Sequence, residues 1–116
     1  MMNNKEKGDF GENVALKYLM SKGAEILEKN YKIKTGEIDI ITKLDSQLVF
    51  VEVKARSNLK YGYPSEAVNY KKIKKIISTA NYYIFKNNLY NEPMRFDVIE
   101  IYLNENKLNH IVNAFW

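Results

Sequence analysis

The stretch GEIDIITKLDSQLVFVEVKAR, residues 36–56, decides how this chain folds. Apolar and β-branched residues dominate two runs, 37–42 and 47–54, which predicts two strands joined by a tight turn. Four charged side chains are set into these apolar strands: Glu37, Asp39, Glu52 and Lys54. Charged residues are rarely buried unless they are paired, so a core hairpin with three acids and a lysine points to chemistry as well as packing.

The register of the hairpin follows from its hydrophobic pattern. Side chains alternate across a strand, so Ile38 and Ile40 should share the face opposite Asp39. A turn centred between Asp45 and Ser46 keeps the valines of the second strand on one face, whereas a loop of odd length would mix the two faces. With this turn the numbers of paired residues sum to 91, and the row expected to face the core is Val49, Val51 and Val53.

Two acids oppose each other in this register, because Asp39 lies directly across from Glu52. Their Cβ atoms would be about 4.5–5.5 Å apart. Two carboxylates at that separation repel by about 3 kcal/mol at an effective dielectric constant of about 20. A divalent cation would offset the repulsion, since Mg²⁺ is held by one or two carboxylates together with water and substrate phosphate. The opposed acids therefore predict a site for Mg²⁺ or Mn²⁺.

Lys54 adds a further functional group to this face. It lies two residues beyond Glu52, where its amine can steady an anion or help to orient and activate a water. A metal, an activated water and a lysine together can hydrolyse a phosphodiester. The alternative is a solvated hairpin face, on which Glu37 lies across from Lys54 and forms a plain cross-strand ion pair.

The composition is that of a globular protein, with 46% hydrophobic and 28% charged residues among 116, so we expect one domain over residues 1–116. The lack of cysteine excludes disulfides and thiol catalysis, and the single histidine, His110, is expected to be structural. A formal charge of +4 and a pI of about 9.1 permit a nucleic-acid partner. We expect a cytoplasmic protein without a membrane partner, because no apolar run approaches membrane-spanning length and the N-terminus is polar.

Local signals give the order of the elements. The sequence DFGE predicts a capping box with Asp9 as N-cap and Glu12 three residues on, so the first helix should begin near Asp9. The other elements are expected to be a strand over 24–33, the hairpin, a loop over 57–66, a long helix over about 65–87, and strands over 95–103 and 108–115. The order α-β-β-β-α-β-β indicates an α/β fold with helices against a mixed sheet. Asp97 should pair with Arg95 or with a backbone donor.

Several motifs along the chain together resemble a known family. They are GENVALKYL near the start, GEIDII, LVFVEVKAR, RFDV and the closing NAF. Asp39 followed by Glu52-x-Lys54 resembles the PD-(D/E)-x-K motif of restriction-endonuclease-like nucleases, with isoleucine rather than proline before Asp39. More narrowly, the chain resembles the YraN family of small proteins. This resemblance implies a restriction-endonuclease-like mixed β-sheet flanked by helices, similar to that of archaeal Holliday-junction resolvases.

The resemblance also implies roles for particular residues. Asp39 and Glu52 look like the metal-binding acids, and Lys54 looks like the catalytic lysine. Glu12 looks like an additional catalytic and metal-binding acid on the first helix. Its alternative role is to complete the capping box with Asp9.

Three more residues are candidates for contact with nucleic acid. Lys72 matches a recurrent basic position in the family and would meet phosphate, or it would belong to a solvated helix face with the neighbouring lysines. Arg56, close beyond Lys54, would clamp phosphate or lie on the surface. Glu37, next to the metal pair, would support it indirectly.

These residues predict a metal-dependent endonuclease that hydrolyses phosphodiester bonds in DNA, with branched repair or recombination intermediates as candidate substrates. Mg²⁺ or Mn²⁺ is the expected cofactor, and a homodimer is plausible if both strands are cut. The residues do not distinguish DNA from RNA as the nucleic-acid substrate. One alternative is a non-catalytic nucleic-acid-binding module of the same fold, and another is a protein-interaction role that uses the tyrosines and the closing Phe115-Trp116.

Overall fold

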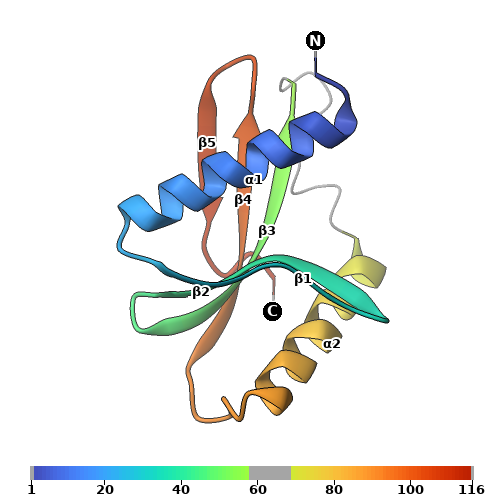
Figure 1. The fold of residues 1–116 in the computed structure, drawn as a ribbon, viewed down its shortest axis with the longest axis vertical. Coiled ribbons are helices and arrows are strands. Elements are labelled where there is room, and N and C mark those ends of the chain that lie inside the picture. The colour runs from blue at the N-terminus through green and yellow to red at the C-terminus, as the bar shows by residue number, and fades with distance from the viewer. Residues whose placement is uncertain (1, 58–68, 116) are drawn as a thin grey trace.

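The computed structural model describes residues 2–57 and 69–115, so most of the loop predicted over 57–66 lies outside the described residues. The elements follow the predicted order (Figure 1). They are α1 (Asn4–Ser21), β1 (Glu25–Ile33), β2 (Gly36–Leu44), β3 (Gln47–Arg56), α2 (Tyr70–Lys86), β4 (Met94–Tyr102) and β5 (Lys107–Ile111). Within the described part of the chain, no helix is both long and apolar enough to cross a membrane.

The strands form one five-stranded mixed sheet in the order β1-β2-β3-β4-β5. Neighbouring strands are antiparallel, except that β3 and β4 run parallel. Parallel strands need a crossover connection, and α2 lies in the segment of the chain that joins them. The α/β architecture expected from the sequence, a mixed sheet with helices packed against it, is confirmed.

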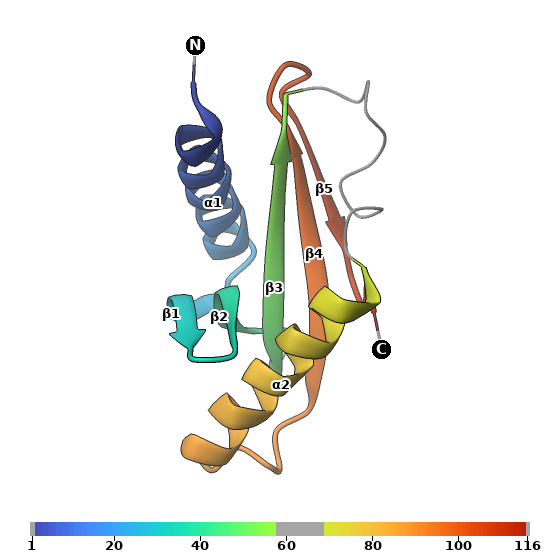
Figure 2. The same ribbon diagram turned by 90° about the vertical axis from the view of Figure 1, so that its right-hand side faces the viewer.

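The two helices cover opposite faces of this sheet (Figure 2). Under α1, Ala15 and Leu19 pack in one core cluster with Val49. Under α2, Ile76 packs in a second cluster with Phe50. The prediction of a single core-facing side for the hairpin was therefore wrong, because each helix supplies an apolar stripe to its own face. The charged residues of β3 that share a face with Phe50 consequently lie on the side that α2 covers.

The turn between β2 and β3 has the predicted form. Asp45 and Ser46 have φ values of 53° and 61°. A type I′ turn needs positive φ at both central residues, and its twist matches that of the flanking strands. The strand pairs run from the turn to Ile40 and Val51, and the residue numbers of every pair sum to 91. The predicted register is confirmed over this range.

Beyond that range β2 departs from the prediction. Ile38 packs in the core under α2 and Ile40 in the core under α1, so the two side chains do not share a face. The reason is that β2 pairs with β3 only from Ile40 to the turn. The residues of β2 that precede Ile40 pair only with β1. Both β1 and β2 run across the direction of β3 and β4 (Figure 1). Glu37 consequently lies opposite Lys32 of β1, and not opposite Lys54 as predicted.

β1 lies at one edge of the sheet and is rich in exposed charge. Its pairing with β2 shifts register at a bulge between Ile26 and Glu28. Its exposed charged residues are Glu25, Glu28, Lys29 and Lys32. Bulges and charged side chains are typical of strands that leave one edge unpaired.

α1 begins earlier than the sequence predicted. Asn3 is its N-cap, and the Asn3 side chain accepts a hydrogen bond from the Glu6 N–H at 2.9 Å. The Glu6 carboxylate accepts one from the Asn3 N–H at 3.1 Å, which completes a capping box. The predicted box with Asp9 as N-cap was therefore wrong, because Asp9 lies inside the helix and pairs with Lys5 on an exposed surface. Glu12 lies in the middle of α1, so it does not cap the helix.

Two other boundaries differ from the prediction. α2 begins at Tyr70 rather than near residue 65, because Asn69 is its N-cap and has an extended backbone. β5 ends at Ile111 rather than at residue 115. Asn113 has a φ of 53°, and this left-handed conformation is incompatible with a continuing strand.

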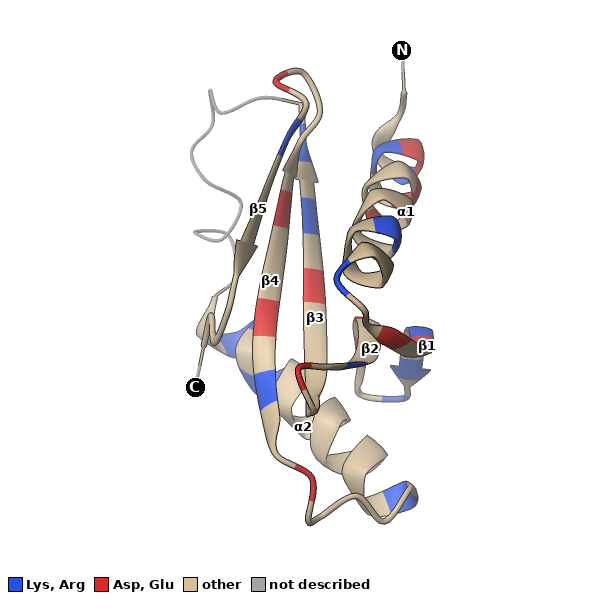
Figure 3. Ribbon diagram, turned by 90° about the vertical axis from the view of Figure 1, so that its left-hand side faces the viewer, with Lys and Arg blue, Asp and Glu red and all other residues tan. Residues whose placement is uncertain are grey.

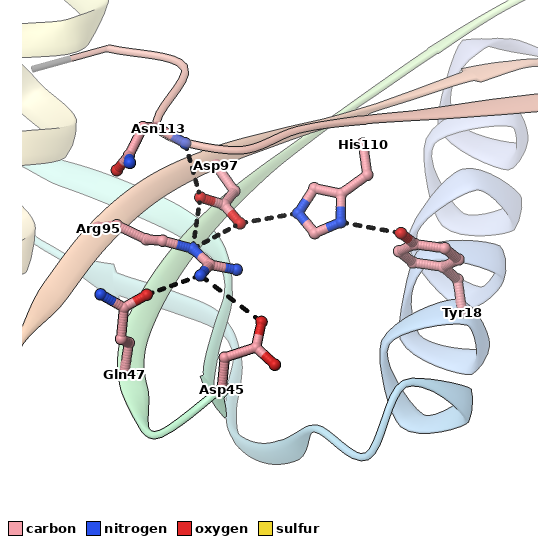
Figure 4. A network of polar contacts seen from close by, with 7 residues as sticks. All are labelled: Tyr18, Asp45, Gln47, Arg95, Asp97, His110 and Asn113. Atoms are coloured by element: carbon pink, nitrogen blue, oxygen red, sulfur yellow. Dashed lines mark hydrogen bonds and ion pairs between the residues drawn. The ribbon is translucent and has the colours of Figure 1, made fainter.

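A polar network ties α1 to β4 and to the chain around β5 (Figure 4). Its centre is the fully buried Asp97, whose two carboxylate oxygens accept from the Arg95 Nε at 3.1 and 3.2 Å. The Asn113 N–H donates to the same carboxylate at 3.2 Å, so Asp97 has both kinds of partner that the sequence suggested. His110 lies between Asp97 at 2.7 Å and the Tyr18 hydroxyl at 2.9 Å, which makes the histidine part of the framework.

Two glycines let the helices approach the strands closely. A Cβ atom on Gly11 of α1 would lie 2.7 Å from the Cβ of Ala55 on β3. A Cβ atom on Gly36 of β2 would overlap the Thr79 hydroxyl and lie 3.1 Å from the backbone oxygen of Lys75, both on α2. The glycines therefore set how closely each helix lies over the hairpin.

Gly11→Ala is expected to lower the free energy of unfolding by about 1–3 kcal/mol, because the new methyl group overlaps Ala55 and forces α1 away from β3. Gly8→Ala in the same helix is the matched control, since nothing lies within 4 Å of its Cβ position. That control should raise the free energy of unfolding by up to about 1 kcal/mol through helix propensity. Urea denaturation measures both, and equal stabilisation by the two changes would contradict the close approach.

Candidate active site

The ladder between β2 and β3 ends where the acids begin. Ile40 and Val51 are the last pair, and Asp39 and Glu52 are the next residue on each strand. The Asp39 carboxylate accepts a hydrogen bond from the backbone N–H of Val53 at 2.8 Å. The backbone N–H of Asp39 in turn donates to the Glu52 carboxylate. Hydrogen bonds from backbone N–H groups to the two carboxylates thus take the place of backbone-to-backbone bonds between the strands. They hold the carboxylates of Asp39 and Glu52 beside each other.

Two lysines from different elements meet at this acid pair. Basic and acidic positions follow each other along β3 (Figure 3), where Lys54 lies two residues beyond Glu52. Lys72 comes from the first turn of α2, and its Nζ lies 3.5 Å from the Glu52 Oε2. The Glu52 side chain is 5% exposed and that of Lys72 is 42% exposed, so the lysine reaches a buried acid from the solvent side. The amines of Lys54 and Lys72 also lie close to each other.

Glu12 approaches the same region from α1. Its half-buried side chain forms a hydrogen bond with the side chain of Asn30 on β1. Asn30 has a φ of 51°, a left-handed conformation that asparagine adopts more readily than most residues. The charge of Asp39 influences Glu12, which shows that the two carboxylates are near each other. Glu12 therefore lies on the Asp39 side of the acid pair, and within the described residues the three acids that the family resemblance picks out do not form one close group.

The pKa values of all three acids are raised. Burial is the largest cause at Glu52 and repulsion from Asp39 the second, and together they raise the pKa of Glu52 to about 7. Burial raises the pKa of Asp39 despite its hydrogen bond from Val53 and the nearby lysines. Burial and the charge of Asp39 raise the pKa of Glu12. The fold therefore gathers these acids at an electrostatic cost, which is common at functional sites.

The pKa values of the two lysines move in opposite directions. Burial, followed by the contact with Lys72, lowers the pKa of Lys54. Burial also acts to lower the pKa of Lys72, but its contact with Lys54 and the charges of Glu52 and Asp39 raise that pKa overall. Lys54 therefore releases its proton more readily than Lys72. An amine of lowered pKa beside two carboxylates is equipped to position a water or to accept its proton.

The remaining candidates lie at the margin of this cluster. Glu37 is exposed, and its charge contributes to the raised pKa values of Glu12 and Asp39. Arg56 is the last residue of β3 and follows Lys54 in the same alternating row. Contact of Arg56 with phosphate stays a prediction.

Two clefts of different chemistry border the cluster. The first, called here the basic cleft, is lined by Asn69, Lys71, Lys72 and Lys75. The second lies between α1 and β1, and its lining is Asp9, Glu12, Asn13, Leu16, Lys29 and Asn30. Lys72 links the basic cleft to the acid pair, because it also contacts Glu52. A phosphate backbone would be attracted to the lysine side of the site.

Asp39 and Glu52 are suited to a divalent cation. Among residues 2–57 and 69–115, no group of three or more His, Cys, Asp or Glu side chains is gathered closely enough to form a complete metal site. A pair of carboxylates is nevertheless sufficient protein ligation for Mg²⁺, which keeps several waters and takes further ligands from substrate phosphate. The mutual repulsion of the two acids is what a cation between them would relieve. Glu12 would then act through water.

The sequence did not mark Asn30 or Gly36 as part of this region. No local signal identifies an asparagine that will adopt a left-handed conformation within a strand. Gly36 had a signal, since a glycine at a strand terminus often marks close approach of another backbone. The small residues Thr79 and Ala80 on α2 would have been the expected partners.

Glu52→Gln is expected to raise the free energy of unfolding above pH 7 by about 1–3 kcal/mol. In the unfolded chain Glu52 ionises near its ordinary pKa of 4.5, whereas in the folded protein it ionises at about 7. The folded state therefore holds a proton that the unfolded state has released, and wild-type stability falls as pH rises through this window. The glutamine is neutral at every pH, so the two proteins should be alike near pH 4 and diverge by pH 8.

Urea unfolding at pH 4 and pH 8 measures this difference. Glu105→Gln, at an exposed turn position, is the control and should show no such divergence. A Glu52→Gln protein that is less stable than the wild type at pH 8 would show that the Lys72 ion pair outweighs the burial of the charge.

Comparison with known proteins places the chain in a family. The sequence model of the uncharacterised protein family UPF0102 matches residues 11–101. A UPF0102 protein of Clostridioides difficile is 68% identical over 114 residues, which cover 98% of this chain and 100% of the relative. A UPF0102 protein of Caldanaerobacter subterraneus is 50% identical over 119 residues, with 98% of each chain covered. One of Clostridium novyi is 45% identical over 116 residues, with 97% of each covered.

The matched region runs from the Gly11 contact on α1 through the acidic hairpin and α2 to β4. The similarity to these relatives extends over nearly the whole chain. The protein therefore belongs to the uncharacterised protein family UPF0102, the YraN-like family that its motifs resemble.

Proposed function

We propose that this protein is a metal-dependent nuclease of the restriction-endonuclease-like superfamily that hydrolyses phosphodiester bonds in DNA. The observation that carries the proposal is the cluster of Asp39, Glu52, Lys54 and Lys72, built around the buried Glu52 at the point where the β2–β3 ladder stops. A hairpin built only for stability would continue its ladder and would not bury repelling acids. The D…E-x-K spacing and the mixed sheet between helices are those that the family resemblance implies.

In the proposed reaction a water attacks the phosphorus of the scissile phosphodiester. Mg²⁺ or Mn²⁺ held by Asp39 and Glu52 would supply positive charge to the phosphate and make the water more acidic. Lys54 positions the water, whose oxygen forms a bond to phosphorus while the bond to the leaving oxygen breaks. The proton released by the water passes to solvent, and solvent returns a proton to the leaving oxygen, which becomes a hydroxyl group. The lysines of the basic cleft hold the adjoining phosphates.

Cleavage assays on labelled DNA test this function. A four-way junction, a flap and a linear duplex are incubated with the protein in Mg²⁺ or Mn²⁺, and with EDTA as the control. We expect metal-dependent cleavage that is faster on the branched forms, because contacts to phosphate favour recognition of structure over sequence. Cleavage confined to one linear sequence would contradict this mode of recognition, and the absence of cleavage on every DNA and RNA form would contradict nuclease activity.

A non-catalytic nucleic-acid-binding module is the second candidate. The ion pair between Lys72 and Glu52 favours it, since an acid that already has a cationic partner is less available to a metal. This alternative predicts DNA affinity that falls steeply with salt, with no cleavage in either metal. Gel shifts run beside the cleavage assay distinguish the two candidates.

A further inference from the structure

We infer that Lys72 is a displaceable counter-ion for the acid pair: in the free protein its ammonium group occupies the position of positive charge at Glu52, and when a divalent cation binds it moves to a phosphate of the nucleic acid. The inference rests on the metal site of the proposed function. It adds a positioning role for Lys72, which would make metal binding and DNA binding depend on each other.

The geometry of the contact is the first step. The Lys72 Nζ lies 3.5 Å from the Glu52 Oε2, whereas a charge-assisted N–H···O hydrogen bond is usually about 2.7–2.9 Å long. The ion pair is therefore loose. It joins a nearly inaccessible carboxylate to a side chain that is 42% exposed, so the lysine is the partner that is free to leave.

The place of Lys72 on α2 is the second step. Its backbone N–H is held at 2.9 Å by the side chain of Asn69, the N-cap, so the main chain stays fixed while the flexible side chain moves. Lys71, Lys72 and Lys75 line the basic cleft around this first helical turn. A helix N-terminus with lysines is a favourable place for phosphate, and Lys72 can reach it without a change in the fold.

The charge balance is the third step. Counted as ionised groups, Asp39 and Glu52 carry two negative charges, and Lys54 and Lys72 carry two positive ones. If a divalent cation bound while all four side chains kept these charges and positions, the site would carry an excess of two positive charges. Release of Lys72 from Glu52 and arrival of a phosphate would remove that excess. The free protein should therefore bind the metal weakly, and DNA should strengthen the binding.

Linkage makes this coupling reciprocal, so the metal should strengthen DNA binding by the same factor. Coupling between sites is typically about 5–150-fold in affinity. Removing the Lys72 charge should move the free protein towards the state that DNA creates, and its metal affinity should rise. A role in stability alone predicts no such rise.

The test is calorimetric titration of the free protein with Mn²⁺ at low salt, for wild type, Lys72→Met, Lys71→Met and Lys75→Met. The last two remove a charge from the same basic cleft, whereas the ion pair with Glu52 is made by Lys72. We expect Lys72→Met to bind Mn²⁺ at least about tenfold more tightly than the wild type. The two controls should stay within about twofold of the wild type, since exposed charges are screened.

A second titration is made with a saturating DNA duplex that carries phosphorothioate linkages to slow cleavage. DNA should raise the Mn²⁺ affinity of the wild type, and this gain should be lost in Lys72→Met. Equal Mn²⁺ affinities of Lys72→Met, its two controls and the wild type would overturn the inference. The proposed metal site would survive that result if Asp39→Asn still abolished binding. No Mn²⁺ binding by any protein, with or without DNA, would overturn both.

Discussion

Replacing Asp39 with asparagine is expected to reduce metal-dependent DNA cleavage by at least about 100-fold while leaving the protein as stable as the wild type or slightly more stable. The amide oxygen can still accept the hydrogen bond from the Val53 N–H, so the end of the ladder is preserved. The negative charge is lost, and with it the ligand for the cation. The repulsion that helps to raise the pKa of Glu52 is lost as well, which should favour the folded state.

Single-turnover cleavage in Mn²⁺ and urea unfolding measure the two quantities on the same preparations. Asp9→Asn is the matched control, because Asp9 is an exposed acid on α1 that pairs with Lys5 on the surface. The control should cleave as the wild type does. An Asp39→Asn protein that cleaves at the wild-type rate would remove Asp39 from the site. An Asp39→Asn protein that loses activity only because it unfolds would show that Asp39 stabilises the fold and does not bind the metal.

Replacing Asp97 with alanine should lower the free energy of unfolding by about 3–5 kcal/mol, the largest change in stability that we expect. Asp97 is fully buried, and its carboxylate binds Arg95, His110 and the backbone of Asn113. Alanine leaves a buried guanidinium group without its main partner and breaks the link through His110 to α1. Losing one member of a buried charge pair is costly, because the other charge stays away from water.

Urea denaturation at neutral pH gives this change from the midpoint, provided that the slope is unchanged. Asp97→Asn keeps the shape and one acceptor oxygen, so it should lose less, about 1–3 kcal/mol. The order alanine, asparagine, wild type in rising stability is the expected result. An alanine variant within about 1 kcal/mol of the wild type would mean that Asp45 and Gln47, which also contact Arg95, satisfy the guanidinium group by themselves.

Local patterns were enough to predict the hairpin and the order of the elements. The turn at Asp45 and Ser46 could be placed because a register shift of one residue would have mixed the two faces of the hairpin. The turn and the register near it could be predicted because strand alternation and turn length are properties of short segments of chain. The same argument also placed Asp39 directly across from Glu52 as a strand pair, but the pairing of β2 with β3 ends at Ile40 and Val51.

Long-range contacts were beyond the reach of these patterns. The start of α1 was misplaced because Asp9 and Glu12 have the spacing of a capping box, whereas the helix is capped by Asn3 with Glu6. The second core was missed because the pattern of one hairpin does not show that a helix covers each face. The Lys72–Glu52 contact joins α2 to β3, and no spacing along the chain encodes it.

The bulged, charged edge of β1 restricts how two copies of this protein could associate. A second chain that extended the sheet at this edge would have to match the register shift between Ile26 and Glu28 and bring four charged side chains close to its own. A cleaving dimer would therefore need to associate through another surface. The spacing of the two candidate sites in such a dimer would then be set by that surface and not by strand pairing at the β1 edge.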